Sequence, residues 1–285
     1  MTFSATRLIA RQAQKNAHIR AFVNSISRVR ARIRQGGLTF IKDEDVLQAV
    51  LKAMQKVQTN THQYYIDELL SDENMERQYE AMRIKYNAKK YKNWEHRVKA
   101  SPGNVSIYYA LVRELKPNRI VETGTATGSM TSYLLAALNK NKCGQLTSLD
   151  LAPISGKLTM DLSLPQNEVG YWIPEVYKDR WTYIPGDSKV TLPRVMVDEK
   201  VDFFIHDSLH TRSHMLFEYA VARSLMREGA IIASDDVLWN NSFDDFLMLN
   251  RLRSWSPNGN PNIAVAINQF DKFETDIGTG ISEQV

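Results

Sequence analysis

The chain has 285 residues, of which 43% are hydrophobic and 24% are charged, the composition of an ordinary folded protein. These proportions exclude a mainly disordered chain, a collagen-like chain and a disulfide scaffold, and the length favours about two domains. No stretch reaches the roughly 18 uncharged apolar residues that a membrane-spanning helix needs. The single cysteine, Cys143, can form neither an internal disulfide nor a cysteine-rich metal site, which favours a reducing, cytoplasmic compartment.

The net charge of +4 hides an uneven distribution. Residues 1–42, the basic leader, hold nine lysines and arginines and no acidic residue. The rest of the chain therefore carries 27 basic and 32 acidic side chains and is acidic overall. Because the basic excess belongs to one segment, we expect no nucleic-acid partner for the protein.

The basic leader predicts an amphipathic helix, because its apolar residues recur every three or four positions from Ile19 to Ile33 among arginines. Three interpretations stay open. The helix lies on an anionic membrane surface, serves as an import peptide, or packs against its own domain or a partner, a second copy included. Packing is the favoured interpretation.

Residues 43–102 predict a helical extension. One apolar stripe runs from Val46 to Val57, and a second helical segment runs from Glu73 to Val98. The sequence Ser101-Pro102-Gly103 breaks this pattern. We therefore divide the chain into the leader (1–42), the helical extension (43–102) and a domain (103–285).

Beyond residue 103, short apolar runs alternate with helical segments. Six runs are strand candidates: Arg119–Glu122, Leu146–Leu149, Trp181–Ile184, Val201–Ile205, Ala230–Ala233 and Asn262–Ile267. Strands that alternate with helices predict right-handed βαβ units. We expect an α/β domain of the Rossmann-like, doubly wound class, with a mostly parallel sheet and an N-terminal all-helical extension.

Acidic residues close five consecutive strand candidates. They are Glu122, Asp150, Asp187, Asp207 and the pair Asp235-Asp236. Ligands of open α/β sheets bind outside the carboxyl ends of the strands. One acid at that edge requires no explanation, but five indicate a function.

The turn after the first strand candidate reads Glu122-Thr-Gly124-Thr125-Ala126-Thr-Gly128. Its glycines let the backbone approach a ligand closely, and the helix that follows offers free N–H groups. The turn lacks the Gly-Lys-Ser/Thr of a phosphate loop and two glycines of the dinucleotide fingerprint. It resembles motif I of class I S-adenosylmethionine (SAM)-dependent methyltransferases, with Ala126 in place of the central glycine.

Two further strand ends fit the same resemblance. Asp150 closes the second strand candidate, where an acid can hold the two hydroxyls of a ribose. Asp187 closes the third, where this superfamily places a residue that contacts adenine. Each acid also suits a helix N-cap. The predicted SAM-binding residues are Glu122, Gly124, Thr125, Gly128, Asp150, Asp187 and Ser188.

A second group of acids, Asp207, Asp235 and Asp236, follows two adjacent strand candidates. Carboxylates brought close together repel one another unless a cation lies among them. Oxygen ligands favour Mg²⁺, Ca²⁺ or Mn²⁺. The alternative is that one carboxylate caps a helix and another faces solvent.

About residues 103–270 resemble a branch of bacterial small-molecule O-methyltransferases, the macrocin O-methyltransferase and cephalosporin-hydroxylase-like group. The motifs that carry this resemblance are Asp207-Ser-Leu-His210, Glu218, Glu228-Gly229, Asp235-Asp236-Val237 and Asn241-Ser-Phe243. The resemblance implies that Asp207, Asp235 and Asp236 hold Mg²⁺, or Mn²⁺ in its place.

The chain departs from this resemblance at the position of the general base, because many relatives read Asp-Gly-Asp-His where this chain reads Asp207-Ser-Leu209-His210. Leu209 removes a carboxylate that can act as a base. His210 is the natural replacement, since a neutral imidazole accepts a proton near pH 7, and Asp207 is the weaker candidate. Alternatively, His210 orients Asp207 or caps the helix that follows.

The sequence thus predicts a SAM-dependent, metal-assisted O-methyltransferase that acts on a hydroxyl of a small molecule or glycan. The alternatives are a metal-independent SAM methyltransferase and a non-catalytic binding protein that is directed to its target by the basic leader. Residues 155–178 predict a lid over the site that also forms one wall of the acceptor-binding pocket. The alternative for this segment is an aromatic patch that packs against the N-terminal helices.

Overall fold

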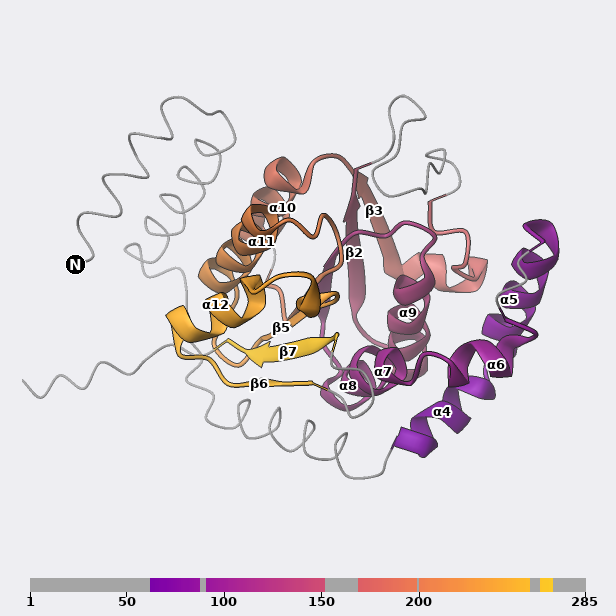
Figure 1. The fold of residues 1–285 in the computed structure, drawn as a ribbon. Helices are drawn as coiled ribbons and strands as arrows, with labels where there is room; N and C mark the ends of the chain where they lie inside the picture. The colour runs from indigo at the N-terminus through magenta and orange to yellow at the C-terminus, as the bar shows by residue number, and fades with distance from the viewer. Residues whose placement is uncertain (1–61, 88–90, 152–168, 199, 257–261, 269–285) are drawn as a thin grey trace, which may run out of the picture.

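The computed structural model describes residues 62–87, 91–151, 169–198, 200–256 and 262–268. The basic leader, the stripe from Val46 to Val57 and most of the segment predicted as a lid lie outside the described residues. The described chain forms a central sheet with helices on both faces, and a group of N-terminal helices lies to one side (Figure 1).

Seven strands form the sheet in the order β3-β2-β1-β4-β5-β7-β6. They are β1 (Arg119–Thr123), β2 (Gln145–Asp150), β3 (Trp181–Pro185), β4 (Phe203–His206), β5 (Ile231–Ser234), β6 (Ser254–Trp255) and β7 (Ala264–Ile267). The first five strands are parallel, and β7 pairs antiparallel with β5 and β6. The prediction of a Rossmann-like, mostly parallel sheet is confirmed. Only the two-residue β6 was absent from the strand candidates.

The sheet separates two hydrophobic cores. Neighbouring residues of a strand point to opposite faces, so Ile120 packs in one core and Val121 in the other. Helices α8 (Ala110–Leu115) and α9 (Ser129–Asn141) contribute to the first core, and α10 (Ser188–Asp198), α11 (Arg212–Leu225) and α12 (Ser242–Asn250) contribute to the second. Burial on both faces explains why the central strands read as continuous apolar runs.

The N-terminal helices are α4 (His62–Leu70), α5 (Glu73–Lys85), α6 (Trp94–Lys99) and α7 (Pro102–Asn104), followed by the π-helix η1 (Val105–Tyr109). Helix α6 ends at Lys99, beside the predicted break at residues 101–103. Pro102 begins α7, as suits a residue that has no N–H to leave unpaired, and helical structure then runs through η1 into α8. Within the described ranges, no helix is long and apolar enough to cross a membrane.

Two carboxylates attach the N-terminal helices to the sheet domain. Glu68 accepts hydrogen bonds from Arg113 Nε at 2.6 Å, Arg113 Nη2 at 2.9 Å and the Tyr109 hydroxyl at 3.0 Å. Asp72 caps α5 through the backbone N–H groups of Asn74 and Met75. The hydroxyl of Tyr177, in the 3₁₀ helix η3 (Glu175–Arg180), donates to both Asp72 oxygens at 2.6 and 2.5 Å.

Replacing Tyr177 by phenylalanine removes this donor and leaves the Asp72 carboxylate half-satisfied. We expect Tyr177→Phe to lower the free energy of unfolding by about 1.5–3 kcal/mol, the range for hydrogen bonds to charged groups. Urea denaturation measures the change. The control is Tyr64→Phe, because the Tyr64 side chain is exposed and its loss should change stability by less than about 0.5 kcal/mol. Equal stability of the two variants would contradict the assignment.

Candidate active site

The glycine turn between β1 and α9 packs directly on the end of β4. Gly124 has a φ of +88°, and a Cβ atom there would lie 1.9 Å from the backbone oxygen of Asp207. Gly128 has a φ of +79°, and its Cβ would lie 2.7 Å from the Cα of Gly170. No other residue fits at either position without moving backbone. Ala126, which replaces the central glycine of the motif, also adopts a positive φ of 43°.

Asp150 lies at the end of β2 and holds the same turn. Its Oδ2 accepts hydrogen bonds from the backbone N–H of Thr125 at 2.9 Å and of Ala126 at 2.7 Å. The residue predicted to hold a ribose therefore lies beside the glycine turn. Thr125 is itself buried, and its Oγ1 has no hydrogen-bond partner among the described residues.

Asp187 lies at the end of β3, beside the start of α10. Its Oδ1 accepts from the backbone N–H of Lys189 at 2.9 Å, which is the helix-capping contact considered as the alternative role. The hydroxyl of the neighbouring Ser188 points away from this edge into a buried network described below.

Glu122 lies beneath the turn and not on its surface. It is fully buried in β1, and its carboxyl group accepts from the hydroxyls of Thr131, in α9, and Ser148, in β2. Burial raises the pKa of Glu122 to about 7, although both hydroxyl donors oppose the shift. Glu122 thus braces the elements that surround the glycine turn.

The second acidic group lies beyond β4 and β5. Burial, and then the nearby charges of Asp235, Glu122 and Asp236, raise the pKa of Asp207 well above its usual range. Burial and the charge of Asp236 raise the pKa of Asp235 to about 6. Asp236 accepts a hydrogen bond from the side-chain amide of Asn262. The adjacent strand ends therefore bring these acids close enough to repel one another, as the sequence predicts.

The chemistry of Asp207, Asp235 and Asp236 fits a divalent cation, since carboxylates that raise one another's pKa are stabilised by positive charge. Their arrangement is not that of a ready coordination shell. Across the described ranges, no group of three or more histidine, cysteine, aspartate or glutamate side chains is placed to hold a metal ion. The metal site therefore stays a prediction.

His210 lies between the carboxylates of Asp207 and Asp236. Its Nε2 is 3.8 Å from Asp207 Oδ1 and 3.7 Å from Asp236 Oδ2. The imidazole is only 6% exposed, and neither ring nitrogen has a hydrogen-bond partner among the described residues. Burial, together with the nearby His206, lowers the pKa of His210, which favours the neutral form that a base requires.

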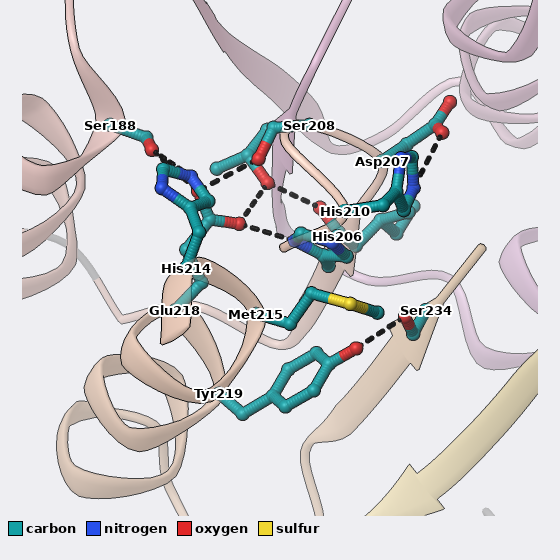
Figure 2. A network of polar contacts seen from close by, with 12 residues as sticks. Ser188, His206, Asp207, Ser208, His210, His214, Met215, Glu218, Tyr219 and Ser234 are labelled. Atoms are coloured by element: carbon teal, nitrogen blue, oxygen red, sulfur yellow. Dashed lines mark hydrogen bonds and ion pairs between the residues drawn. The ribbon is translucent and has the colours of Figure 1, made fainter. Parts of the chain in front are cut away.

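Behind this edge, a buried polar network surrounds Glu218 of α11 (Figure 2). Its other members are Thr123, Ser188, His206, Ser208 and His214. The sequence indicated Glu218 only through the family resemblance, and it left His206 without a role. A signal did exist, because His214 and Glu218 lie four residues apart on the buried face of an amphipathic helix, where polar residues are unusual.

The described end of the predicted lid covers the glycine turn. The backbone N–H of Gly170 donates to Ala126 at 2.9 Å, and that of Trp172 donates to Thr127 at 3.0 Å. The Trp172 ring stacks on Tyr79 of α5, with ring centroids 5.2 Å apart. This part of the segment therefore packs against the N-terminal helices, which was the alternative interpretation. Residues 152–168 lie outside the described residues.

The raised pKa of Glu122 makes the stability of the fold depend on pH. Between its ordinary value of 4.5 and about 7, the folded protein keeps a proton that the unfolded chain releases, so stability falls as the pH rises. The expected loss is about 3 kcal/mol. The free energy of unfolding is measured by urea denaturation at pH 4.5 and 7.5. Its decrease between these pH values should be smaller in Glu122→Gln than in the wild type, and unchanged in the exposed control Glu175→Gln. An unchanged pH dependence in Glu122→Gln would argue against a protonated, buried Glu122.

Comparisons with known proteins concern the domain that carries the glycine turn and the two acidic groups. Residues 121–237 match the family model described as a methyltransferase domain. A search of curated proteins gives no match to the chain. The fold is similar to that of a Klebsiella pneumoniae protein named as an O-methyltransferase, at 17% identity and a TM-score of 0.50, over 76% of this chain and 99% of that one.

Two solved structures with bound ligands are also similar. One is an O-methyltransferase from Bacillus cereus in complex with SAH, at 17% identity and a TM-score of 0.49, over 74% of this chain and 98% of that one. The other is TomG, an O-methyltransferase of tomaymycin synthesis from Streptomyces achromogenes, in complex with SAM, at 15% identity and a TM-score of 0.48, over 70% and 91%. The resemblance of this part of the chain to a methyltransferase domain, which the sequence indicates, is confirmed by the family model over residues 121–237.

Proposed function

We propose that the protein transfers the methyl group of SAM to a hydroxyl oxygen of a small-molecule or glycan acceptor, with assistance from a divalent cation. One observation carries the proposal. The glycine turn of the SAM side packs against the backbone of Asp207, the first residue of the acceptor side, so closely that no side chain fits between them. The two sets of predicted residues thus meet at one place on the sheet.

That place is the point at which the order of the strands reverses. Strands β2 and β3 continue from β1 in one direction, and β4 and β5 continue in the other. Ligands of open α/β sheets bind in the crevice at this point. The predicted SAM residues Gly124, Asp150 and Asp187 lie at the ends of β1, β2 and β3, whereas Asp207 and His210 follow β4. Donor and acceptor bound on either side face each other, as an in-line transfer requires.

SAM would supply a methyl group bonded to a positively charged sulfur. The acceptor oxygen would attack the methyl carbon, the carbon–sulfur bond would break, and SAH would leave. The acceptor hydroxyl loses its proton as the oxygen–carbon bond forms, so the chain must provide a base. Two observations support His210 for this role: its ring nitrogens have no hydrogen-bond partner among the described residues, and it lies beside Asp207. Asp207 is the second candidate, since its raised pKa makes it a stronger base than an ordinary aspartate.

The cation belongs to the proposal through Asp207, Asp235 and Asp236, whose repulsion a positive charge would relieve. When bound, a divalent cation lowers the pKa of an acceptor hydroxyl. A second candidate function is metal-independent methyl transfer. The observation that favours it is the lack, among the described side chains, of a group of three placed to hold a metal ion.

The SAM side of the proposal predicts that Asp150→Ala loses SAM affinity. Asp150 positions two N–H groups of the glycine turn and is the predicted ribose ligand, so we expect Kd to rise roughly tenfold to hundredfold. Isothermal titration calorimetry with SAM measures the affinity. Asp179→Ala, at an exposed position of η3, is the matched control and should bind as the wild type does. Equal affinity of Asp150→Ala and the wild type would overturn the cofactor assignment.

The proposed cation site predicts that the protein binds Mn²⁺ and that methyl transfer requires a divalent cation. Free Mn²⁺ followed by electron paramagnetic resonance should decrease on addition of wild-type protein and SAH, and Asp235→Asn should bind several-fold less. Release of SAH in the presence of a panel of sugars and phenols should stop with EDTA and return with Mg²⁺ or Mn²⁺. Full turnover in EDTA would establish the metal-independent candidate and leave methyl transfer intact.

A further inference from the structure

One buried carboxylate, that of Glu218, accepts hydrogen bonds from residues at or just after the ends of β1, β3 and β4 (Figure 2). We infer that Glu218 is a positioning residue that holds the SAM side and the acceptor side of the site in register. The inference rests on the proposed function, because it assigns Glu218 a role in bringing the two bound reactants together. It does not depend on which residue is the base or on whether a cation takes part.

The two oxygens of Glu218 accept hydrogen bonds from both sides of the site. Oε1 accepts from the hydroxyl of Ser188 at 2.5 Å, from the hydroxyl of Ser208 at 3.0 Å and from Nε2 of His214 at 2.8 Å. Oε2 accepts from the hydroxyl of Thr123 at 2.6 Å and from Nδ1 of His206 at 2.6 Å. Five donors therefore converge on one group.

The donors occupy particular places in the chain. Thr123 precedes Gly124 at the end of β1, and Ser188 follows Asp187 after β3. On the acceptor side, His206 and Ser208 flank Asp207.

Each strand-end donor is therefore the immediate neighbour of a residue predicted to bind SAM or to take part in the reaction. A hydrogen bond that fixes a donor also fixes the backbone from which the neighbouring residue extends. Glu218 thus anchors the SAM side and the acceptor side through the same carboxylate.

The network is suited to rigid positioning because the carboxylate is charged. Burial by itself raises the pKa of Glu218, but the charges of His206 and His214 and their hydrogen bonds hold this pKa well below its usual range. Charge-assisted hydrogen bonds are shorter and roughly twice as strong as neutral ones. An amide in the same place would present an NH₂ group to at least one of the donors, so the charge and the geometry are both required.

The first experiment compares Glu218→Gln with Arg227→Gln, which also removes a hydrogen bond to a carboxylate, that of Asp202, but lies at the amino end of β4 and not at the strand ends of the site. We expect Glu218→Gln to weaken binding of SAH about tenfold or more in calorimetry, and Arg227→Gln to leave SAH affinity unchanged. Unchanged SAH affinity and turnover in a folded Glu218→Gln variant would overturn the inference. A wild-type protein that fails to bind SAH would overturn the proposed function instead.

The second experiment uses single donors and stands even if Glu218→Gln does not fold. Thr123→Val removes a donor on the SAM side and should raise KM for SAM several-fold. Ser208→Ala removes a donor on the acceptor side and should lower kcat, with SAH affinity retained. Because both donors act through Glu218, the losses of kcat/KM in the two single variants should not add in the double variant. Variants that change only the melting temperature, or effects that add independently, would show a structural role and refute the positioning role.

Discussion

The closeness of the glycine turn to the end of β4 is the constraint on which the site depends. A side chain at Gly124 would collide with the backbone oxygen of Asp207, so the turn lies against β4 with no atom between them. Parallel pairing of β1 with β4 sets this contact, because both strands end at the same edge. Shifting either strand by one residue would separate the turn from Asp207 and reverse the faces of its side chains. The proposed reaction therefore depends on a backbone contact before it depends on any charged group.

Two buried carboxyl groups near this edge differ in pKa because their hydrogen-bond partners differ. Glu122 and Glu218 are both fully buried. Glu122 has only neutral hydroxyl donors, and burial raises its pKa to about 7. Glu218 lies against His206 and His214, and its pKa is lowered instead. Below pH 7 the Glu122 carboxyl group is mostly protonated and braces the turn with little charge in the core, whereas the charged Glu218 accepts hydrogen bonds from several strand ends. The same residue type thus serves two structural purposes on the neighbouring elements β1 and α11.

The sequence predicted the sheet well and the interior of the site poorly. Apolar runs located six strands, because parallel strands covered on both faces must be apolar, whereas the two residues of β6 are too few to form a pattern. Acids at strand ends located Asp150 and Asp207, since the edge of a parallel sheet follows from topology. Periodicity indicates that a residue is buried but not which residue it meets. The contact between His206 and Glu218, twelve positions apart, therefore required the structure.

The N-terminal helices take part in this organisation although they lie outside the sheet. Trp172 donates its backbone N–H to Thr127 of the glycine turn and stacks its ring on Tyr79 of α5. From α6, the Arg97 side chain hydrogen bonds with the hydroxyl of Ser129 at the start of α9. The turn is thus held by Asp150 on one side and by a segment supported by the helical extension on another. Because a SAM site needs a fixed turn, loosening α5 should disturb cofactor binding without touching a residue that contacts the cofactor. Helices α5 and α6 thus support the elements around the glycine turn as well as packing on the sheet domain.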